Sequence, residues 1–219
     1  MRVRMTNRTS RENEDLAQFR DLVATHGITV SEPVMSTLQR YRDLLLSWND
    51  RVRLVSRSDG HRILSRHVLE SLLLLQHIPR ETKRLADVGS GGGLPGIPIW
   101  MASDIEVTLI ESARMKSLFL KEVERTVPRG GLEILHDRAE NVANSRPGTF
   151  DIVTSRAVAG LDHVWELAKP LLKHQGSMIS LKGPGEAEDE LGGIGVPFTE
   201  HLVPLEDRTV AIVIARRES

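Results

Sequence analysis

A glycine-rich segment constrains the fold of this chain more than any other feature of its sequence. The segment, Asp87–Gly96, reads DVGSGGGLPG and begins within RLADVG, an apolar run typical of a short buried strand. Its glycines Gly91, Gly93 and Gly96 satisfy the pattern G-x-G-x-x-G. Glycines are needed where a strand turns sharply into a helix while its backbone contacts a ligand, because side chains would block that approach. The segment therefore predicts a strand, a ligand-binding turn and a helix.

Short apolar runs alternate with helical patterns over the rest of the chain. The predicted strands of this alternating part cover residues 84–89, 106–111, 132–136, 150–157 and 177–183. Helical spacing of apolar residues separates them, for example over residues 161–172, which indicates right-handed crossovers and a parallel sheet. Two further strand-like runs, residues 199–204 and 209–216, are joined by only four residues, too few for a helical crossover. We expect them to form an antiparallel hairpin at the sheet edge.

The first 83 residues have a different, helical character. We predict a loose arm over the first dozen residues and helices over 14–25, 31–48 and 61–76, with a loop over 51–60. Ser31 and Pro33 supply the N-cap and the first turn of the second helix. We therefore divide the chain into an N-terminal basic helical subdomain, residues 1–83, and an α/β domain, residues 84–219.

Charge is distributed unevenly between these two parts. Residues 1–83 hold 14 Lys and Arg against 10 Asp and Glu, whereas residues 84–219 hold 15 against 20. Seven arginines lie between Arg40 and Arg66, with three acidic residues among them. Such a stretch is typical either of a surface that binds an anion or of a solvated helix face, and charge alone does not decide between them.

The composition excludes several kinds of chemistry. The chain has no cysteine, so it forms no disulfide, thiolate metal site or cysteine nucleophile. Its eight histidines show no H-x-x-x-H or H-E-x-x-H spacing, so we expect no metal site. No apolar run approaches the roughly 18 residues of a membrane-spanning helix, and the N-terminus lacks the apolar centre of a secretory signal. We expect a cytoplasmic protein that does not bind membranes.

An acidic residue at the end of the second predicted strand complements the glycine segment. Glu111 lies 20 residues after Gly91, a spacing that suits a carboxylate accepting hydrogen bonds from ribose hydroxyls. Together they indicate a cofactor containing a nucleoside, either a dinucleotide, whose pyrophosphate binds a helix N-terminus, or S-adenosylmethionine. By analogy between folds, the C-terminal hairpin favours S-adenosylmethionine, because most dinucleotide-binding sheets continue with parallel strands.

The fourth predicted strand ends in Ser155-Arg156-Ala157. Methyltransferases that act on exocyclic amines usually carry an Asn/Asp-Pro-Pro-aromatic box there, and methylation of base carbons commonly uses a cysteine; this chain has neither. A ring nitrogen such as guanine N7 already presents a lone pair, so its methylation depends on alignment rather than on a general base. Arg156 either fixes the cofactor carboxylate or stacks on the base, or it forms a salt bridge at a strand end.

Several motifs occur together in an order that resembles a known family. They are WNDRVRLVS, SRHVLESLLLL, ADVGSGGGLPGIP, VTLIES, HDRAE, FDIVTSRAVAGL, LLKHQG and ISLKG, between about Tyr41 and Gly183. Together they resemble the bacterial 16S rRNA (guanine-N7) methyltransferase family, RsmG/GidB. The resemblance implies a class I S-adenosylmethionine-dependent methyltransferase fold, Rossmann-like, with residues 84–219 as the catalytic domain. It also implies methylation of N7 of guanine 527 in the 530 loop of 16S rRNA, either in free RNA or in the small ribosomal subunit.

The same resemblance assigns roles to individual residues. It implies cofactor contacts from Gly89, Ser90, Gly91, Gly93, Leu94, Glu111, Ala139, Glu140 and Arg156. Arg156 is also the candidate catalytic residue, and the candidates for binding RNA are Arg51, Arg53, Arg66, His67 and Lys182. For His67 a structural histidine, and for Lys182 a solvated strand terminus, remain alternatives. Family members commonly have Lys at Asp50 and Asp at Glu70, which leaves the RNA contacts of this chain open.

Other functions also remain open. The chain either methylates another RNA site, a small molecule or a protein, or is a non-catalytic nucleotide-binding regulator or an NAD(P)-dependent oxidoreductase. The basic N-terminal part favours an RNA substrate among these. We expect the protein to act as a monomer.

Overall fold

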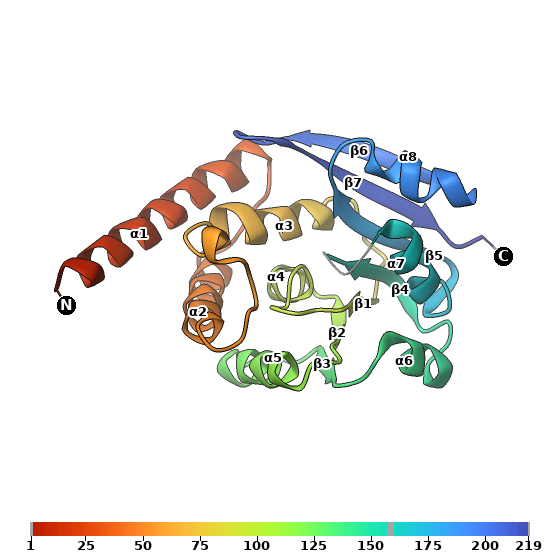
Figure 1. Ribbon diagram of the computed structural model, residues 1–219, viewed down its shortest axis with the longest axis horizontal. Helices are drawn as coiled ribbons and strands as arrows, with labels where there is room; N and C mark the ends of the chain where they lie inside the picture. Colours follow the sequence, from red (N-terminus) through yellow and green to blue (C-terminus); the bar gives the residue numbers. More distant parts are fainter. Residues whose placement is uncertain (1, 157–159, 219) are drawn as a thin grey trace.

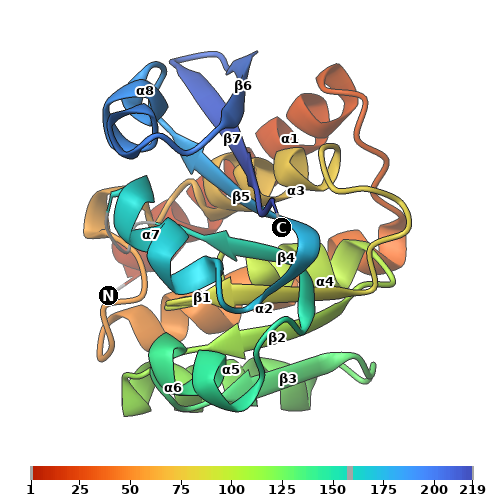
Figure 2. The same cartoon turned by 90° about the vertical axis from the view of Figure 1, so that its right-hand side faces the viewer.

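A mixed sheet organises the structure. The computed structural model describes residues 2–156 and 160–218. Within those residues the strands are β1 (Arg84–Val88), β2 (Glu106–Ile110), β3 (Leu132–Leu135), β4 (Phe150–Ser155), β5 (Leu172–Lys182), β6 (Phe198–Pro204) and β7 (Thr209–Arg216). Their order is β3-β2-β1-β4-β5-β7-β6 (Figure 2). The neighbouring pairs from β3 to β5 are parallel, and β7 is antiparallel to β5 and β6, which confirms the predicted sheet and hairpin.

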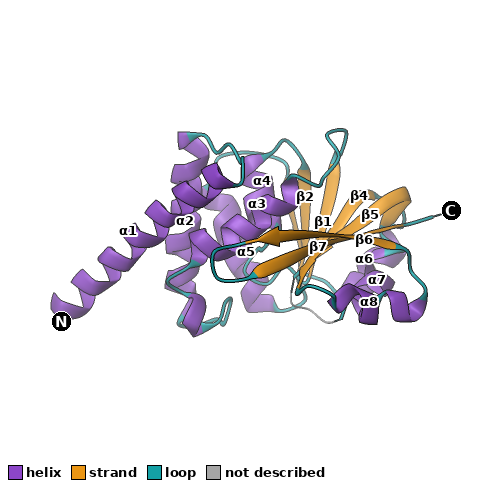
Figure 3. Ribbon diagram, turned by 90° about the horizontal axis from the view of Figure 1, so that it is seen from above, coloured by secondary structure: helices purple, strands orange, loops and turns teal. Residues whose placement is uncertain are grey.

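Helices cover both faces of the sheet (Figures 1 and 3). One face carries α1 (Arg2–Thr25), α2 (Glu32–Asn49), α3 (Leu69–Leu75), α4 (Gly96–Ala102) and α5 (Arg114–Thr126). The other face carries α6 (Ala139–Ser145), α7 (Leu161–Ala168) and α8 (Glu186–Glu190). Short 3-10 turns span Arg57–Asp59 and Gly192–Ile194, and a π-helix spans Ile63–Val68. No helix within the described residues is long and apolar enough to cross a membrane.

The N-terminal helices share a hydrophobic core with the sheet. Phe19, Leu38 and Leu72 of the helical part belong to the same buried cluster as Leu85 of β1 and Val107 of β2. Burial of this apolar surface is the main force that holds α1, α2 and α3 against the sheet. The division at residue 83 stays a prediction, but the two parts pack as one body.

The predicted N-terminal arm is wrong, because α1 begins at Arg2 and continues to Thr25. Residues 2–25 contain neither Gly nor Pro, so nothing in the sequence interrupts the helix. Buried side chains near its C-terminal end, Phe19 and Leu22 among them, anchor the helix to the core. Once that part is formed, adding further turns costs little free energy. The N-terminal end of α1 projects from the molecule (Figure 1).

The start of β5 also differs from the prediction. We expected a helix over residues 161–172 and a strand from 177, but α7 ends at Ala168 and β5 already begins at Leu172. Pro170 has no N–H with which to continue the helical ladder. Residues 173–176, KHQG, carry no apolar side chain and so do not resemble a strand in sequence. The backbone still joins the sheet, with a shift in register between Leu172 and Ser177 and a positive φ of 63° at Gln175. Residue 157, the predicted end of the fourth strand, lies outside the described residues.

The predicted helix over residues 61–76 begins as the π-helix Ile63–Val68 and continues as α3. An aspartate from α1 caps its irregular first turn: Asp15 accepts hydrogen bonds from Leu64 N (3.0 Å) and Ser65 N (2.8 Å). Asp15 is only 4% exposed, so these two N–H groups have no access to water as an alternative partner. A charged acceptor thus joins α1 to the segment that leads into the candidate site.

Replacing Asp15 by alanine is expected to lower the free energy of unfolding by about 2–4 kcal/mol, because two buried N–H groups lose a charged acceptor. Urea unfolding followed by circular dichroism measures this difference. The control is Asp21→Ala, an exposed carboxylate on the same helix. Equal stabilities of the two variants would show that the cap does not stabilise the fold.

Candidate active site

The carboxyl ends of the central strands meet at one edge of the sheet. Val88 of β1 pairs in register with Ile110 of β2, which in turn pairs with Leu135 of β3. On its other side β1 pairs with β4 in parallel. The chain order of the strands reverses at β1, and open α/β sheets bind ligands at such a point. The glycine segment, Glu111 and Arg156 follow three of these strand ends, so the fold brings them together.

Two glycines of the segment are required by packing rather than by a ligand. Gly93 has a φ of 83°, and a Cβ there would collide with the side chain of Ile97. A Cβ on Gly96 would lie 2.5 Å from Leu109 Cδ2 and 2.8 Å from Asp87 Oδ2. Glycine at these positions lets α4 pack closely on β1 and β2. The predicted cofactor contact of Gly93 thus stays a prediction, since the structure gives this residue a packing role.

Glu111 fixes the glycine segment to the loop that follows β2. Its Oε2 accepts a hydrogen bond from Gly91 N (2.8 Å), and its Oε1 accepts one from Ala113 N (2.7 Å). A carboxylate offers about four lone-pair positions, so each oxygen retains one for a further donor. The side chain is only 5% exposed. Glu111 is therefore oriented by the backbone and still able to accept hydrogen bonds from a ligand.

A cavity of about 370 Å³ lies beside these groups. Its lining residues are Leu54, Gly89, Ser90, Gly91, Gly92, Leu94, Glu111, Ser112, Lys116 and Arg156. The volume falls within the roughly 300–1,000 Å³ of small-molecule sites. The predicted cofactor residues line it with the exception of Gly93, Ala139 and Glu140.

Ala139 and Glu140 form the first turn of α6, after β3. Ala139 is buried and Glu140 is exposed. The loop before them is joined to the cavity through His136, whose Nε2 lies 3.1 Å from the backbone oxygen of Ser112. The two residues therefore lie at the carboxyl edge of the sheet but outside the lining of the cavity, and their contacts with the cofactor stay predictions.

Sequence reasoning missed the part of the lining that the N-terminal helices position. The hydroxyl of Tyr41 on α2 donates a hydrogen bond to the backbone oxygen of Gly92 (2.5 Å). Asn49 Oδ1 accepts from Leu54 N (2.8 Å) and so holds the cavity-lining Leu54 in place. Lys116 enters from the first turn of α5. No spacing pattern identifies these residues, because their contacts depend on how helices from two parts of the chain pack.

Arg156 connects the cavity to the segment before β1. Its Nη1 lies 2.8 Å from His67 Nδ1 and 3.4 Å from Glu70 Oε2. Burial lowers the pKa of His67, and a neutral ring whose Nδ1 accepts from the guanidinium satisfies this geometry. Although burial favours the neutral form of Glu70, its hydrogen bond with Arg208 and the nearby charge of Arg156 hold the pKa of Glu70 below its usual range. Arg156 therefore faces a carboxylate and an imidazole that fix its position.

Asp87 is a buried acid directly behind the glycine segment. Its Oδ2 accepts a hydrogen bond from Gly96 N (3.1 Å), and its Oδ1 has no hydrogen-bond partner among the described residues. The side chain is fully buried. Burial raises the pKa of Asp87 to about 7, and the Gly96 N–H only partly opposes this rise.

The raised pKa of Asp87 makes stability depend on pH. Because the folded state binds this proton more tightly than the unfolded state does, stability falls as the pH rises from the unfolded value, about 3.9, to the folded one. Between pH 5 and pH 8 the wild type is expected to lose about 2–3 kcal/mol of unfolding free energy relative to Asp87→Asn. Denaturant unfolding at a series of pH values, without cofactor, measures the difference.

The control for this pH dependence is Asp104→Asn, the same substitution at an exposed position. The unfolding free energy of Asp104→Asn is expected to change with pH in the same way as that of the wild type. If the unfolding free energy of Asp87→Asn also changed with pH as that of the wild type does, the result would contradict the raised pKa of Asp87.

The residues predicted to bind RNA occupy two different environments. Arg51 and Arg53 are exposed on the loop after α2, next to the cavity-lining Leu54. Arg66 instead pairs with Asp59 (2.8 Å), and His67 is buried. The structure thus leaves the first two arginines accessible to a large anion, and it gives Arg66 and His67 internal contacts.

Lys182 lies at the end of β5, where it forms ion pairs with Glu190 (3.0 Å) and Glu186 (3.6 Å). It does not line the cavity. Its predicted contact with RNA stays a prediction without support from this arrangement. Within the described residues no group of three or more His, Asp and Glu side chains is arranged to hold a metal ion.

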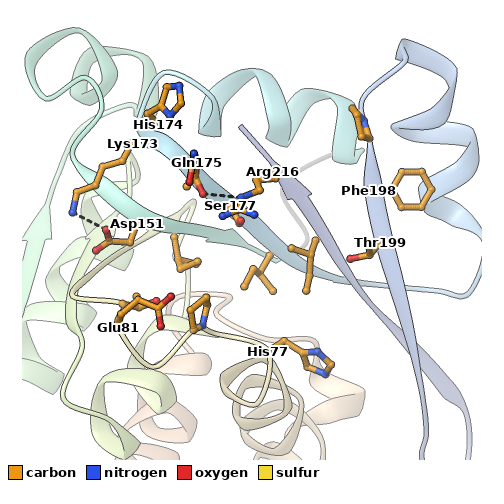
Figure 4. A pocket seen from close by; sticks show the side chains of 17 residues that line it. His77, Glu81, Asp151, Lys173, His174, Gln175, Ser177, Phe198, Thr199 and Arg216 are labelled. Atoms are coloured by element: carbon orange, nitrogen blue, oxygen red, sulfur yellow. Dashed lines mark hydrogen bonds and ion pairs between the residues drawn. The ribbon is translucent and has the colours of Figure 1, made fainter. Parts of the chain in front are cut away.

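A larger hollow of about 600 Å³ lies at the opposite edge of the sheet (Figure 4). It is lined by the ends of β5, β6 and β7 and by the segment before β1. Lys173 pairs there with Asp151 (2.6 Å), and Arg216 Nε donates to the backbone oxygen of Gln175 (3.2 Å). Lys173 and Asp151 thus pair with each other, and neither the glycine segment nor Glu111 lines this hollow. We therefore assign the candidate site to the smaller cavity, where those groups converge.

Sequence comparisons identify relatives over most of the chain. The GidB family, rRNA small subunit methyltransferase G, matches residues 34–193. A ribosomal RNA small subunit methyltransferase G of Gluconobacter oxydans is 41% identical over 163 residues, 74% of this chain and 81% of that protein. One from Syntrophotalea carbinolica is 32% identical over 212 residues, 92% of this chain and 97% of that protein.

Solved structures resemble the fold at low sequence identity. A putative S-adenosyl-L-methionine-dependent methyltransferase of Methanococcus maripaludis has a TM-score of 0.57 at 13% identity and covers 81% of this chain and 93% of its own. An rRNA methylase of Streptococcus thermophilus has a TM-score of 0.52 at 15% identity, and the match covers 70% of this chain and 98% of that protein. With the strand order described above, these matches show the class I methyltransferase fold, as predicted.

Proposed function

The chain belongs to the GidB family, rRNA small subunit methyltransferase G, and from this membership we propose that it transfers a methyl group from S-adenosylmethionine to N7 of guanine 527 in 16S rRNA. One observation carries the proposal: the cavity at the carboxyl edge of the sheet, where the glycine segment, Glu111 and Arg156 converge. The mapping to the 530 loop follows from the family resemblance.

The cavity residues fit the chemical groups of S-adenosylmethionine. The backbone of Gly89 and Gly91 offers a surface without side chains. Glu111 retains lone pairs for two ribose hydroxyls, and the Arg156 guanidinium provides a cation for the methionine carboxylate. When bound, S-adenosylmethionine supplies an electrophilic methyl group on a sulfonium. The task left to the protein is to hold donor and acceptor in line.

Alignment is sufficient for this reaction because N7 of guanine carries no proton. The contacts of Arg156 with His67 and Glu70 fix its guanidinium before any ligand arrives. Groups fixed in advance lose little entropy on binding, and correct placement lowers the barrier of a two-substrate reaction. The cavity therefore needs no general base, in agreement with the absence of one in the Ser155-Arg156 segment.

We assign RNA binding to the basic N-terminal part, residues 1–83. Arg51 and Arg53 are exposed on the loop that leads to the cavity-lining Leu54. Arginines in such a position contact phosphates, which provides affinity that depends on salt and carries no sequence readout. The guanine must leave its stack to reach the cavity, as bases do in enzymes that modify them.

The proposal is tested by incubating the purified protein with methyl-labelled S-adenosylmethionine and small ribosomal subunits from a strain that lacks this enzyme. We expect label in 16S rRNA and none when subunits already carry the modification. Free 16S rRNA in parallel shows which form is the substrate. The absence of transfer to both forms would falsify the proposal, and tighter binding of a dinucleotide than of S-adenosylmethionine in calorimetry would contradict the cofactor.

A further inference from the structure

A carboxylate behind the cavity joins three parts of the chain that are remote in sequence. Glu70 lies on α3, and its Oε2 is 3.4 Å from Nη1 of the cavity-lining Arg156. Its Oε1 accepts a hydrogen bond from Nη2 of Arg208, 138 residues away in the link between β6 and β7. We name these three residues the Glu70 cluster. Through it, the C-terminal hairpin contacts a residue that contacts Arg156.

The Glu70 cluster is largely shielded from water. The side chains of Glu70, Arg156 and Arg208 are 11%, 19% and 24% exposed. Buried charges require partners, and losing one partner of a shielded pair is costly. Here each oxygen of the carboxylate faces a different arginine, so the two guanidinium groups share one acid.

Because two arginines share the Glu70 carboxylate, Arg208 affects the direction of the Arg156 guanidinium. Guanidinium and carboxylate groups favour a bidentate arrangement with two parallel hydrogen bonds. In the structure Arg208 engages Oε1 and Arg156 contacts Oε2, so a bidentate pairing with Arg156 would compete with Arg208 for the orientation of the carboxylate. With Arg208 absent, that competition ends: the carboxylate turns to face Arg156 with both oxygens, and Arg156 gains a second hydrogen bond by turning toward Glu70 and out of the cavity.

We propose that Arg208 is a positioning residue: by holding one oxygen of Glu70, it keeps the Arg156 guanidinium directed into the cavity, where it binds the carboxylate of the methyl donor. This inference rests on the proposed function only in that the cavity takes S-adenosylmethionine. It adds the link between β6 and β7 to the parts of the chain that determine donor affinity.

The same link offers a matched control. Arg62 Nη1 pairs with Asp207 Oδ2 (2.7 Å), so it also holds this link against the N-terminal helices. Arg208 contacts Asp207 as well (3.1 Å), but it is Arg208 that reaches Glu70. Arg62→Ala therefore weakens the docking of the link, whereas Arg208→Ala additionally frees Glu70.

The experiment measures dissociation constants for S-adenosylmethionine by calorimetry on the full chain, without RNA. Arg208→Ala is expected to raise the constant about tenfold, the equivalent of one lost charge-assisted hydrogen bond. Arg62→Ala is expected to change it less than twofold, and Arg208→Lys to recover most of the affinity. In an Arg156→Ala background, Arg208→Ala is expected to have no further effect, because the residue on which it acts is gone. Melting temperatures confirm that each variant is folded.

Two results overturn the inference alone: equal donor affinities of Arg208→Ala and Arg62→Ala, or an undiminished effect of Arg208→Ala in the Arg156→Ala background. If Arg208→Ala does not fold, Arg208→Lys and Arg208→Gln decide, since the inference requires the uncharged variant to bind the donor more weakly. A wild-type protein that binds no S-adenosylmethionine overturns the proposed function, and this inference with it. Donor binding without methylation of RNA contradicts the proposed function while leaving the role of Arg208 intact.

Discussion

Arg156→Ala is expected to reduce methyl transfer to small-subunit RNA by about 100- to 1,000-fold, because the cavity loses its oriented cation and the alignment of the donor with it. The guanidinium lines the cavity, and its contacts with His67 and Glu70 fix its direction. Single-turnover transfer of labelled methyl groups measures the effect. Arg156→Lys retains the charge but not the planar set of donors, and its rate of methyl transfer is expected to lie between those of the wild type and Arg156→Ala.

The matched control is Arg146→Ala, which removes an ion pair with Glu133 (2.6 Å) that does not line the cavity. It is expected to transfer methyl groups at the wild-type rate. Transfer by a folded Arg156→Ala variant within about threefold of wild type, less than one directed hydrogen bond contributes, would show that Arg156 has no part in the reaction.

Glu111→Ala is expected to weaken S-adenosylmethionine binding by about 100-fold or more. The carboxylate holds Gly91 N and Ala113 N, so its removal loosens the glycine segment as well as deleting the acceptor for ribose hydroxyls. Two hydrogen bonds to a charged group contribute about 1.5–3 kcal/mol each, and 1.4 kcal/mol is tenfold in affinity. Equilibrium dialysis with labelled donor measures the loss.

Glu106→Ala at the other end of β2 serves as the control, because its carboxylate is exposed and pairs with Arg84 at the opposite edge of the sheet. Its donor affinity is expected to equal that of the wild type. If Glu111→Ala binds the donor as tightly as Glu106→Ala does, the donor does not lie against the glycine segment.

Features encoded by neighbouring residues could be predicted from the sequence. The strands around Asp87, Glu111 and Arg156 were placed correctly because short apolar runs between turn residues have few alternative structures. The spacing between Gly91 and Glu111 predicted a carboxylate that binds a ribose beside the glycine segment. In the structure Glu111 accepts a hydrogen bond from Gly91 N, and its contact with a ribose stays a prediction. The four-residue link before Thr209 likewise restricted the last two strands to an antiparallel pair.

Features that depend on packing between distant segments were not predictable in this way. Tyr41 reaches Gly92 across 51 residues, and Arg208 reaches Glu70 across 138, so no local pattern reports either contact. The early start of β5 was missed because residues 173–176, KHQG, carry no apolar side chain and so interrupt the strand pattern in the sequence. In the structure the pairing with β4 is also irregular there, between Leu172 and Ser177.

Charge patterns were the least decisive signal. An excess of arginine identified the N-terminal part but did not separate residues that face solvent from residues that hold the fold. In that part Arg53 is exposed, whereas Arg66 pairs with Asp59. In the α/β domain, Lys182 likewise pairs with Glu190. Which cation is free depends on where the acidic partners lie in three dimensions.

Locating the modified atom tests the proposed methylation of guanine 527. 16S rRNA from small subunits treated with the protein and S-adenosylmethionine is reduced with borohydride and cleaved with aniline, which breaks the strand at 7-methylguanosine. We predict cleavage at a single position, guanine 527, that depends on both the protein and the donor. A methyl group found by mass spectrometry on another atom or another nucleotide, with no cleavage in the 530 loop, would contradict it.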